Sequence, residues 1–197
     1  MSIYTCCFRY LCGSSPRQNV PIHTLPNIVL DTSSMGHEVV IVKNGLRICG
    51  TGAALGNTPI LQNKAYFEVK LQQSGVWGVG IASPEAELDR VPLGSDAHSW
   101  VLCSDCVLRH NSEEPHRLVA PPQEGDVLGV SFDHVELNFY INGKNTNTPL
   151  TGFKGTLYPV LYVDEGAILD VVFRDFSYPP PVGFDAIMIE KSILGHD

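Results

Sequence analysis

The sequence predicts an all-β protein, a bent sandwich of two antiparallel sheets with short terminal segments. Two observations carry this prediction. Runs in which apolar and polar residues alternate with period two recur along the chain, at a spacing of about 8–12 residues. Turn signals, including two Asn-Gly pairs, separate these runs. An antiparallel sandwich buries the apolar faces against each other and collects the connecting loops at its two ends.

The first strands are predicted at residues 28–31, 39–43 and 46–49, and Asn44-Gly45 joins the last two as a hairpin. The glycine-rich stretch GTGAALG at 50–56 superficially resembles a dinucleotide-binding fingerprint. A further strand follows it, whereas a phosphate-binding loop needs a helix whose N-terminal amides face the anion. We therefore expect a flexible loop at one end of the sandwich.

The central segment at 66–82 reads YFEVKLQQSGVWGVGIA. In its first half apolar residues alternate with Glu68, Lys70 and Gln72, which is typical of a strand with one buried face. Ser74-Gly75 interrupts the pattern, and a second alternating run follows. The segment is predicted to form a hairpin in the middle of the sandwich. Gly78 and Gly80 indicate that something lies close over one face of its second strand.

The rest of the chain continues the same pattern. We expect an acidic surface loop, three further strand pairs and a closing segment, located as follows: the loop at 83–95, a hairpin around Ser104-Asp105, a long hairpin at 128–141 around Asp133-His134 that ends at Asn142-Gly143, a pair formed by 157–163 and 168–173, and the closing segment at 184–189.

Composition limits the function classes. The 197 residues fit one domain at 27–190 with tails at 1–26 and 191–197, and 44% hydrophobic and 17% charged residues describe a globular protein. A net charge of −8 without a basic cluster is a poor match for phosphate backbones, so we expect no nucleic-acid partner. We expect neither a signal peptide nor a membrane-spanning helix, and therefore a cytoplasmic monomer with reduced thiols.

The N-terminal tail leaves two interpretations open. Cys6, Cys7 and Cys12 lie among small apolar residues, where cysteines can be S-acylated. Two or three acylated cysteines would anchor the protein firmly to a membrane and make it a membrane-associated, tethered adaptor. The other interpretation is a tail with free thiols.

No metal, cofactor or catalytic centre is expected. Cys103-x-x-Cys106 is followed by His110 at a spacing too short for the usual zinc finger, and its cysteines flank a predicted tight turn. A redox CxxC motif belongs at a helix N-terminus, which is not predicted here. No G-x-S-x-G elbow is present, so a hydrolase-type enzyme is the weakest of the function hypotheses.

Five segments in order resemble the SPRY domain family: YFEVKLQQSGVWGVGIA, PLGS with the later SW pair, GDVLGVSFDHVELNFYING, GTLYPVLYV and PPVGF. The resemblance implies a bent, concanavalin-like β-sandwich that serves as a protein-interaction module and not as an enzyme. It also implies that a protein or short peptide partner binds to loops at one edge of the sandwich. The matching loops here are 52–60, 83–92, 103–106 and 164–166.

The candidate partner-binding residues in these loops are Thr58, Pro59, Glu87, Leu88, Asp89, Arg90, Val91, Asp164 and Glu165. SOCS-box-containing relatives grip an Asn-rich peptide partly through a Tyr and a Trp, and the matching positions here are not aromatic. The acidic side chains favour a basic partner segment. Ordinary solvated loop charges are the alternative.

Overall fold

The computed structural model describes residues 27–90 and 92–189. Predictions that fall on the tail cysteines Cys6, Cys7 and Cys12, on Val91 or on 190–197 lie outside the described residues. Within the described ranges the chain forms fourteen strands and no helix: β1 Leu30–Met35, β2 Glu38–Val42, β3 Arg47–Gly56, β4 Ala65–Gln73, β5 Val76–Ala82, β6 Ser99–Cys103, β7 Val107–His110, β8 Glu113–Arg117, β9 Val127–Phe132, β10 Leu137–Ile141, β11 Lys144–Asn145, β12 Tyr158–Asp164, β13 Ile168–Val172 and β14 Asp185–Ala186.

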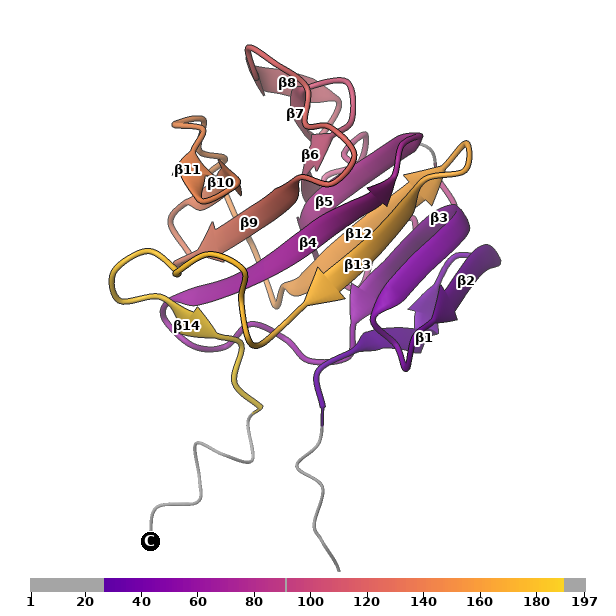
Figure 1. Ribbon diagram of the computed structural model, residues 1–197, viewed down its shortest axis with the longest axis horizontal. Coiled ribbons are helices and arrows are strands. Elements are labelled where there is room, and N and C mark those ends of the chain that lie inside the picture. The colour runs from indigo at the N-terminus through magenta and orange to yellow at the C-terminus, as the bar shows by residue number, and fades with distance from the viewer. Residues whose placement is uncertain (1–26, 91, 190–197) are drawn as a thin grey trace, which may run out of the picture.

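The strands form two sheets that face each other, as predicted (Figure 1). Sheet A has the order β1-β3-β12-β5-β6-β7-β8, and sheet B has the order β2-β3-β13-β4-β9-β10-β11. Every pairing is antiparallel except that of the short strand β14, which runs parallel to β4. The predicted closing segment at 184–189 is therefore partly a strand, and Ile187 in it is buried.

Strand β3 belongs to both sheets. Its first half pairs with β13 in sheet B through Ile48, and its second half pairs with β12 in sheet A from Gly52 onward. Between the halves, Gly50 and Gly52 have φ angles of 92° and 120°, which only glycine adopts at little cost. The predicted flexible loop at 50–56 is therefore wrong, because these glycines bend a strand and do not end it.

The core lies between the two sheets and follows the predicted alternation. Phe67 and Val69 of β4 face Val79 and Ile81 of β5 within one continuous apolar cluster. Trp100 is also in this cluster and is 2% exposed. The period-two signal correctly identified the buried faces of β4, β5, β9 and β10, but not that of the longest strand, β3, whose second half was predicted as a loop.

Three of the five predicted strand pairs form, and two do not. The hairpins β2–β3, β6–β7 and β9–β10 are confirmed, as is the Asn142-Gly143 turn that joins β10 to β11. The predicted hairpin at 66–82 is wrong, because β4 lies in sheet B and β5 in sheet A. The predicted pairing of 157–163 with 168–173 is wrong for the same reason: β12 and β13 lie in opposite sheets.

Two carboxylates are buried on the outer face of sheet B. Glu68 is 0% exposed and accepts hydrogen bonds from the backbone amides of Ser177 and Tyr178, at 2.7 and 2.9 Å. Asp170 is 3% exposed; Arg47 Nε donates to its Oδ1 at 2.5 Å and Lys43 Nζ to its Oδ2 at 2.7 Å. Glu68 is thus satisfied by hydrogen bonds and Asp170 by ion pairs, which offset the cost of burying each carboxylate.

Acid is expected to remove the contribution of Asp170 to stability. Burial by itself would raise the pKa of Asp170, but the hydrogen bonds and charges of Arg47 and Lys43 outweigh it and hold the pKa below its ordinary value. A carboxylate whose pKa is lowered by folding stabilises the protein above its unfolded pKa and loses that contribution as the pH falls through the folded value. The free energy of unfolding should therefore drop below about pH 4.

Urea denaturation of the wild type and of Asp170→Asn at several pH values checks this expectation. The variant should be less stable at neutral pH, and the difference should shrink as the pH falls below about 4. A difference that stays constant down to the lowest pH would contradict it.

Candidate functional site

The outer face of sheet A carries a second, smaller apolar cluster that the sequence reasoning missed. Small and apolar residues of β3, β5, β6 and β12 form it, and residues of the 83–96 loop cover them. Ala86 and Leu93 of this loop are buried in the cluster, and Leu88 packs against it. The loop is therefore docked along the sheet and does not project freely into solvent.

A hydrogen-bonded clamp holds the 83–96 loop against β3. The amide of Ala53 donates to the carbonyl of Leu88 at 2.8 Å. Asp89 accepts from the backbone N–H of His37 at 2.7 Å, and its second oxygen lies 2.6 Å from Nδ1 of the same histidine. These hydrogen bonds, that of the backbone first, lower the pKa of Asp89. Gly36 is required here because a Cβ would lie 2.8 Å from the Leu88 carbonyl oxygen.

The turn between β12 and β13 lies beside the same part of β3. The hydroxyl of Thr51 donates to Asp164 Oδ1 at 3.0 Å, and the amide of Glu165 donates to the same oxygen at 2.8 Å. The next residue, Gly52, is in close contact with the Leu88 carbonyl. The segment Thr51-Gly52 thus lies between the 83–96 loop and the turn. We call the surface formed by His37, Thr51, Glu87–Arg90 and Asp164-Glu165 the loop face.

The loop face brings together most of the candidate residues. Glu87, Asp89, Asp164 and Glu165 give it acidic character, and Arg90 is paired with Glu87 at 3.3 Å. Leu88 is half-buried beneath them against the outer cluster. The face therefore combines fixed backbone positions with exposed negative charge.

Two candidate residues lie elsewhere. Thr58 and Pro59 follow the far end of β3, where Asn57 is hydrogen-bonded to the backbone of Val29. Thr58 is 8% exposed, and its hydroxyl donates to Asn57 Oδ1 at 3.1 Å. Five residues of extended strand between Thr51 and Gly56 separate them from the loop face by roughly 17 Å. Thr58 and Pro59 therefore lie at the opposite end of β3 from the loop face.

The turn at 103–106 contains two buried free thiols, Cys103 and Cys106. Burial raises the pKa of Cys103 to about 11 and also raises the pKa of Cys106, so both remain protonated at neutral pH. Asp105 in the same turn forms a two-hydrogen-bond ion pair with Arg109. Within residues 27–90 and 92–189, no group of three His, Cys, Asp or Glu side chains is placed to hold a metal ion.

A groove of about 730 Å³ at the other end of β5 contains a serine and a histidine that bear on the hydrolase hypothesis. The hydroxyl of Ser83 donates to Glu85 at 2.5 Å and lies 3.2 Å from Nδ1 of His98. A catalytic triad needs its carboxylate on the histidine, where it orients the ring. Here the carboxylate bonds to the serine two residues before it, which stabilises the turn after β5.

His37 and Thr51 were missed by the sequence reasoning. His37 lies between two predicted strands and belongs to no motif, yet it is the partner of Asp89 across the clamp. Thr51 lies between two glycines, Gly50 and Gly52, and that flanking pair was the available signal. Glycines with positive φ on both sides bend the strand at Thr51, which is half-buried and donates its hydroxyl to Asp164.

The comparisons with known proteins agree with this architecture. The SPRY domain model matches residues 64–175. SPRY domain-containing protein 7 from Gallus gallus is 52% identical over 96% of this chain and 97% of its own length, and the Homo sapiens protein of that name is 51% identical over the same shares. No described helix is long and apolar enough to cross a membrane.

Two solved structures share the fold at low sequence identity. The crystal structure of the TRIM65 PSpry domain has a TM-score of 0.63 and 20% identity, and covers 76% of this chain and 90% of that chain. The stonustoxin structure has a TM-score of 0.60 and 19% identity, and covers 74% of this chain and 27% of that chain. SPRY domains generally serve as protein-interaction modules. With a family match over more than half its length and relatives about half identical across nearly all of it, the chain belongs to the SPRY domain family.

Proposed function

We propose that this protein is a non-enzymatic, cytoplasmic adaptor that binds a protein or short peptide through the loop face. The observation that carries the proposal is the clamp of Asp89 on His37, which fixes the 83–96 loop beside the Asp164 turn. A loop held in one conformation loses little conformational entropy when it binds a partner. The packing of the 83–96 loop over the outer apolar cluster holds it in one conformation, and this supports recognition by the loop face.

The charge of the loop face supports a basic segment as the partner. Glu87, Asp89, Asp164 and Glu165 project from two neighbouring loops, and His37 and Arg90 already have acidic partners there. Complementary charge steers a partner to the surface and discriminates against acidic competitors. The side chain of Glu165 is exposed and makes no hydrogen bond in the described structure, so it can be changed without disturbing the clamp.

Affinity purification with the full chain tests the proposal. Glu165→Arg should reduce recovery of specific partners about tenfold, because it places a like charge against a basic segment. The matched control is Glu113→Arg, an exposed glutamate on β8 at the edge of sheet A. Equal partner recovery by the wild type and by Glu165→Arg, or equal losses in both variants, would remove the loop face as the binding surface.

A further inference from the structure

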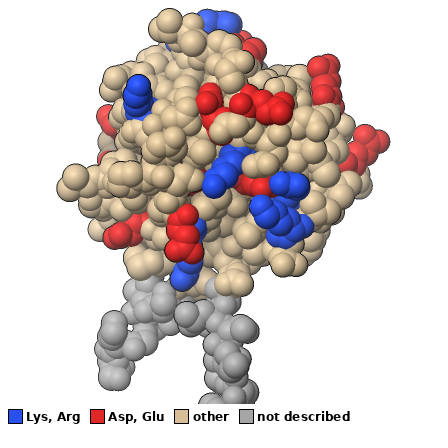
Figure 2. All heavy atoms as spheres, in the orientation of Figure 1, with Lys and Arg blue, Asp and Glu red and all other residues tan. Residues whose placement is uncertain are grey.

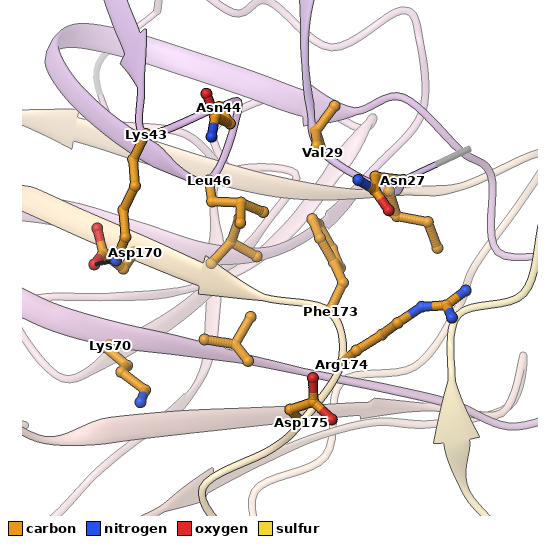
Figure 3. Close-up of a pocket in the computed structure, with 13 residues that line it drawn as sticks. Asn27, Val29, Lys43, Asn44, Leu46, Lys70, Asp170, Phe173, Arg174 and Asp175 are labelled. Carbon is orange, nitrogen blue, oxygen red and sulfur yellow. Dashed lines mark hydrogen bonds and ion pairs between the residues drawn. The ribbon is translucent and has the colours of Figure 1, made fainter. Parts of the chain in front are cut away.

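A groove on the outer face of sheet B lies on a different surface from the loop face. It has a volume of about 410 Å³ and is bounded by the β2–β3 turn, the end of β13 and residues 27–29. Figure 3 shows Lys43, Lys70 and Arg174 around the apolar side chains of Leu46 and Phe173. Phe173 is 4% exposed and forms part of the floor. The groove thus has an apolar floor and a cationic rim.

Two of the cations in this region are needed by the fold, and two are not. Arg47 and Lys43 both bond to the buried carboxylate of Asp170. Lys70 lies opposite Asp170 in the strand register, but neither Lys70 nor Arg174 forms an ion pair with any residue in the described part of the chain. Both side chains are therefore available to form ion pairs with a bound partner.

The region stands out because the chain as a whole is acidic. The three cations that line the groove, Lys43, Lys70 and Arg174, and its two carboxylates, Asp170 and Asp175, leave a local net charge of +1, whereas the chain carries −8. Figure 2 shows basic side chains gathered near the centre of this face around an acidic one. An anionic group is attracted here and repelled by much of the remaining surface.

We propose that this groove binds an acidic protein segment, with an apolar side chain on the floor formed by Leu46 and Phe173 and carboxylates at Lys70 and Arg174. The recessed floor suits an inserted side chain, because burial of apolar area adds to the charge attraction. Two cations without ion-pair partners in the described residues supply too little attraction to hold a flat anionic membrane by themselves. The groove and the loop face would then bind partners of opposite charge.

Fluorescence anisotropy with the full-length protein tests the proposal. The probe is a labelled synthetic peptide in which leucines alternate with glutamates, and a sister peptide has glutamine at each glutamate. The glutamate peptide should bind about tenfold more tightly than its sister at low salt, and raising the salt should weaken it. In Lys70→Gln/Arg174→Gln its affinity should fall about tenfold, because each partly exposed ion pair is modest.

The matched control is Lys144→Gln/Lys154→Gln, which removes the same charge from two exposed lysines that line other surfaces. This control variant should bind the glutamate peptide with the same affinity as the wild type. The loop-face variant Glu165→Arg should also bind the peptide with wild-type affinity. Thermal denaturation confirms that each variant is folded. The proposal is overturned if both double variants bind alike, or if the protein binds phosphatidylserine vesicles through Lys70 and Arg174 but does not bind the peptide.

Discussion

Replacing Gly80 with alanine is expected to destabilise the protein by roughly 3 kcal/mol or more. A Cβ at this position would lie 1.9 Å from the backbone carbonyl oxygen of Trp100 on the paired strand β6. No rotamer change relieves a clash with backbone, so β5 and β6 would have to move apart and lose hydrogen bonds at the centre of sheet A. Chemical denaturation of the purified variant measures the loss.

The same strand provides a matched control. Gly78 is two residues away on β5, and a Cβ there would meet the side chain of Tyr162 at 3.6 Å, an ordinary van der Waals contact. Gly78→Ala should therefore change the free energy of unfolding by less than about 1 kcal/mol. Similar losses in the two variants would show that glycine is needed at both sites for some reason other than the approach of Trp100.

Removing the carboxylate of Glu68 is the second change with a large expected effect. Glu68→Ala leaves the backbone amides of Ser177 and Tyr178 without their acceptor and opens a cavity beneath the 173–184 segment. An unsatisfied buried donor costs about 1–3 kcal/mol, so the two amides together cost about 3 kcal/mol. Urea denaturation should show this loss, and hydrogen exchange should accelerate at the amides of Ser177 and Tyr178.

Tyr66→Phe is the control for Glu68→Ala, because it removes a neighbouring hydroxyl and leaves the carboxylate of Glu68 in place. The Tyr66 hydroxyl donates to Glu68 at 3.3 Å, so its removal leaves both amide bonds intact and should cost less than about 1 kcal/mol. If Glu68→Ala were no more destabilising than Tyr66→Phe, with unchanged exchange at Ser177, the carboxylate would not be what anchors this segment.

The sequence predicted which faces are buried better than it predicted which strands are neighbours. Alternation placed Phe67 and Val79 in the core, because period two depends only on each strand and its own environment. The partner of a strand depends on the path of the whole chain. Ser74-Gly75 has the composition of a hairpin turn, but it carries the chain from sheet B to sheet A, where Gly75 packs against the Glu165–Ala167 turn. No local pattern distinguishes these two paths.

The candidate site was predicted only as a set of loops. The resemblance to SPRY domains pointed to 83–92 and 164–166, and the structure places Leu88 and Asp164 of these loops beside Thr51-Gly52. It could not show that Asp89 is held by His37, since these residues are 52 positions apart in the chain. Glycines and alanines from Gly50 to Gly56 also disguised a strand, because their β propensity is low. Gly52 is instead needed for the close approach of the Leu88 carbonyl.

The sharing of β3 between the two sheets has a consequence for how the domain comes apart. In sheet A this strand separates β1 from β12, and in sheet B it separates β2 from β13. Neither layer can release it without breaking the other, so the layers have no independent melting behaviour. Heat should therefore dismantle them together, in one calorimetric transition.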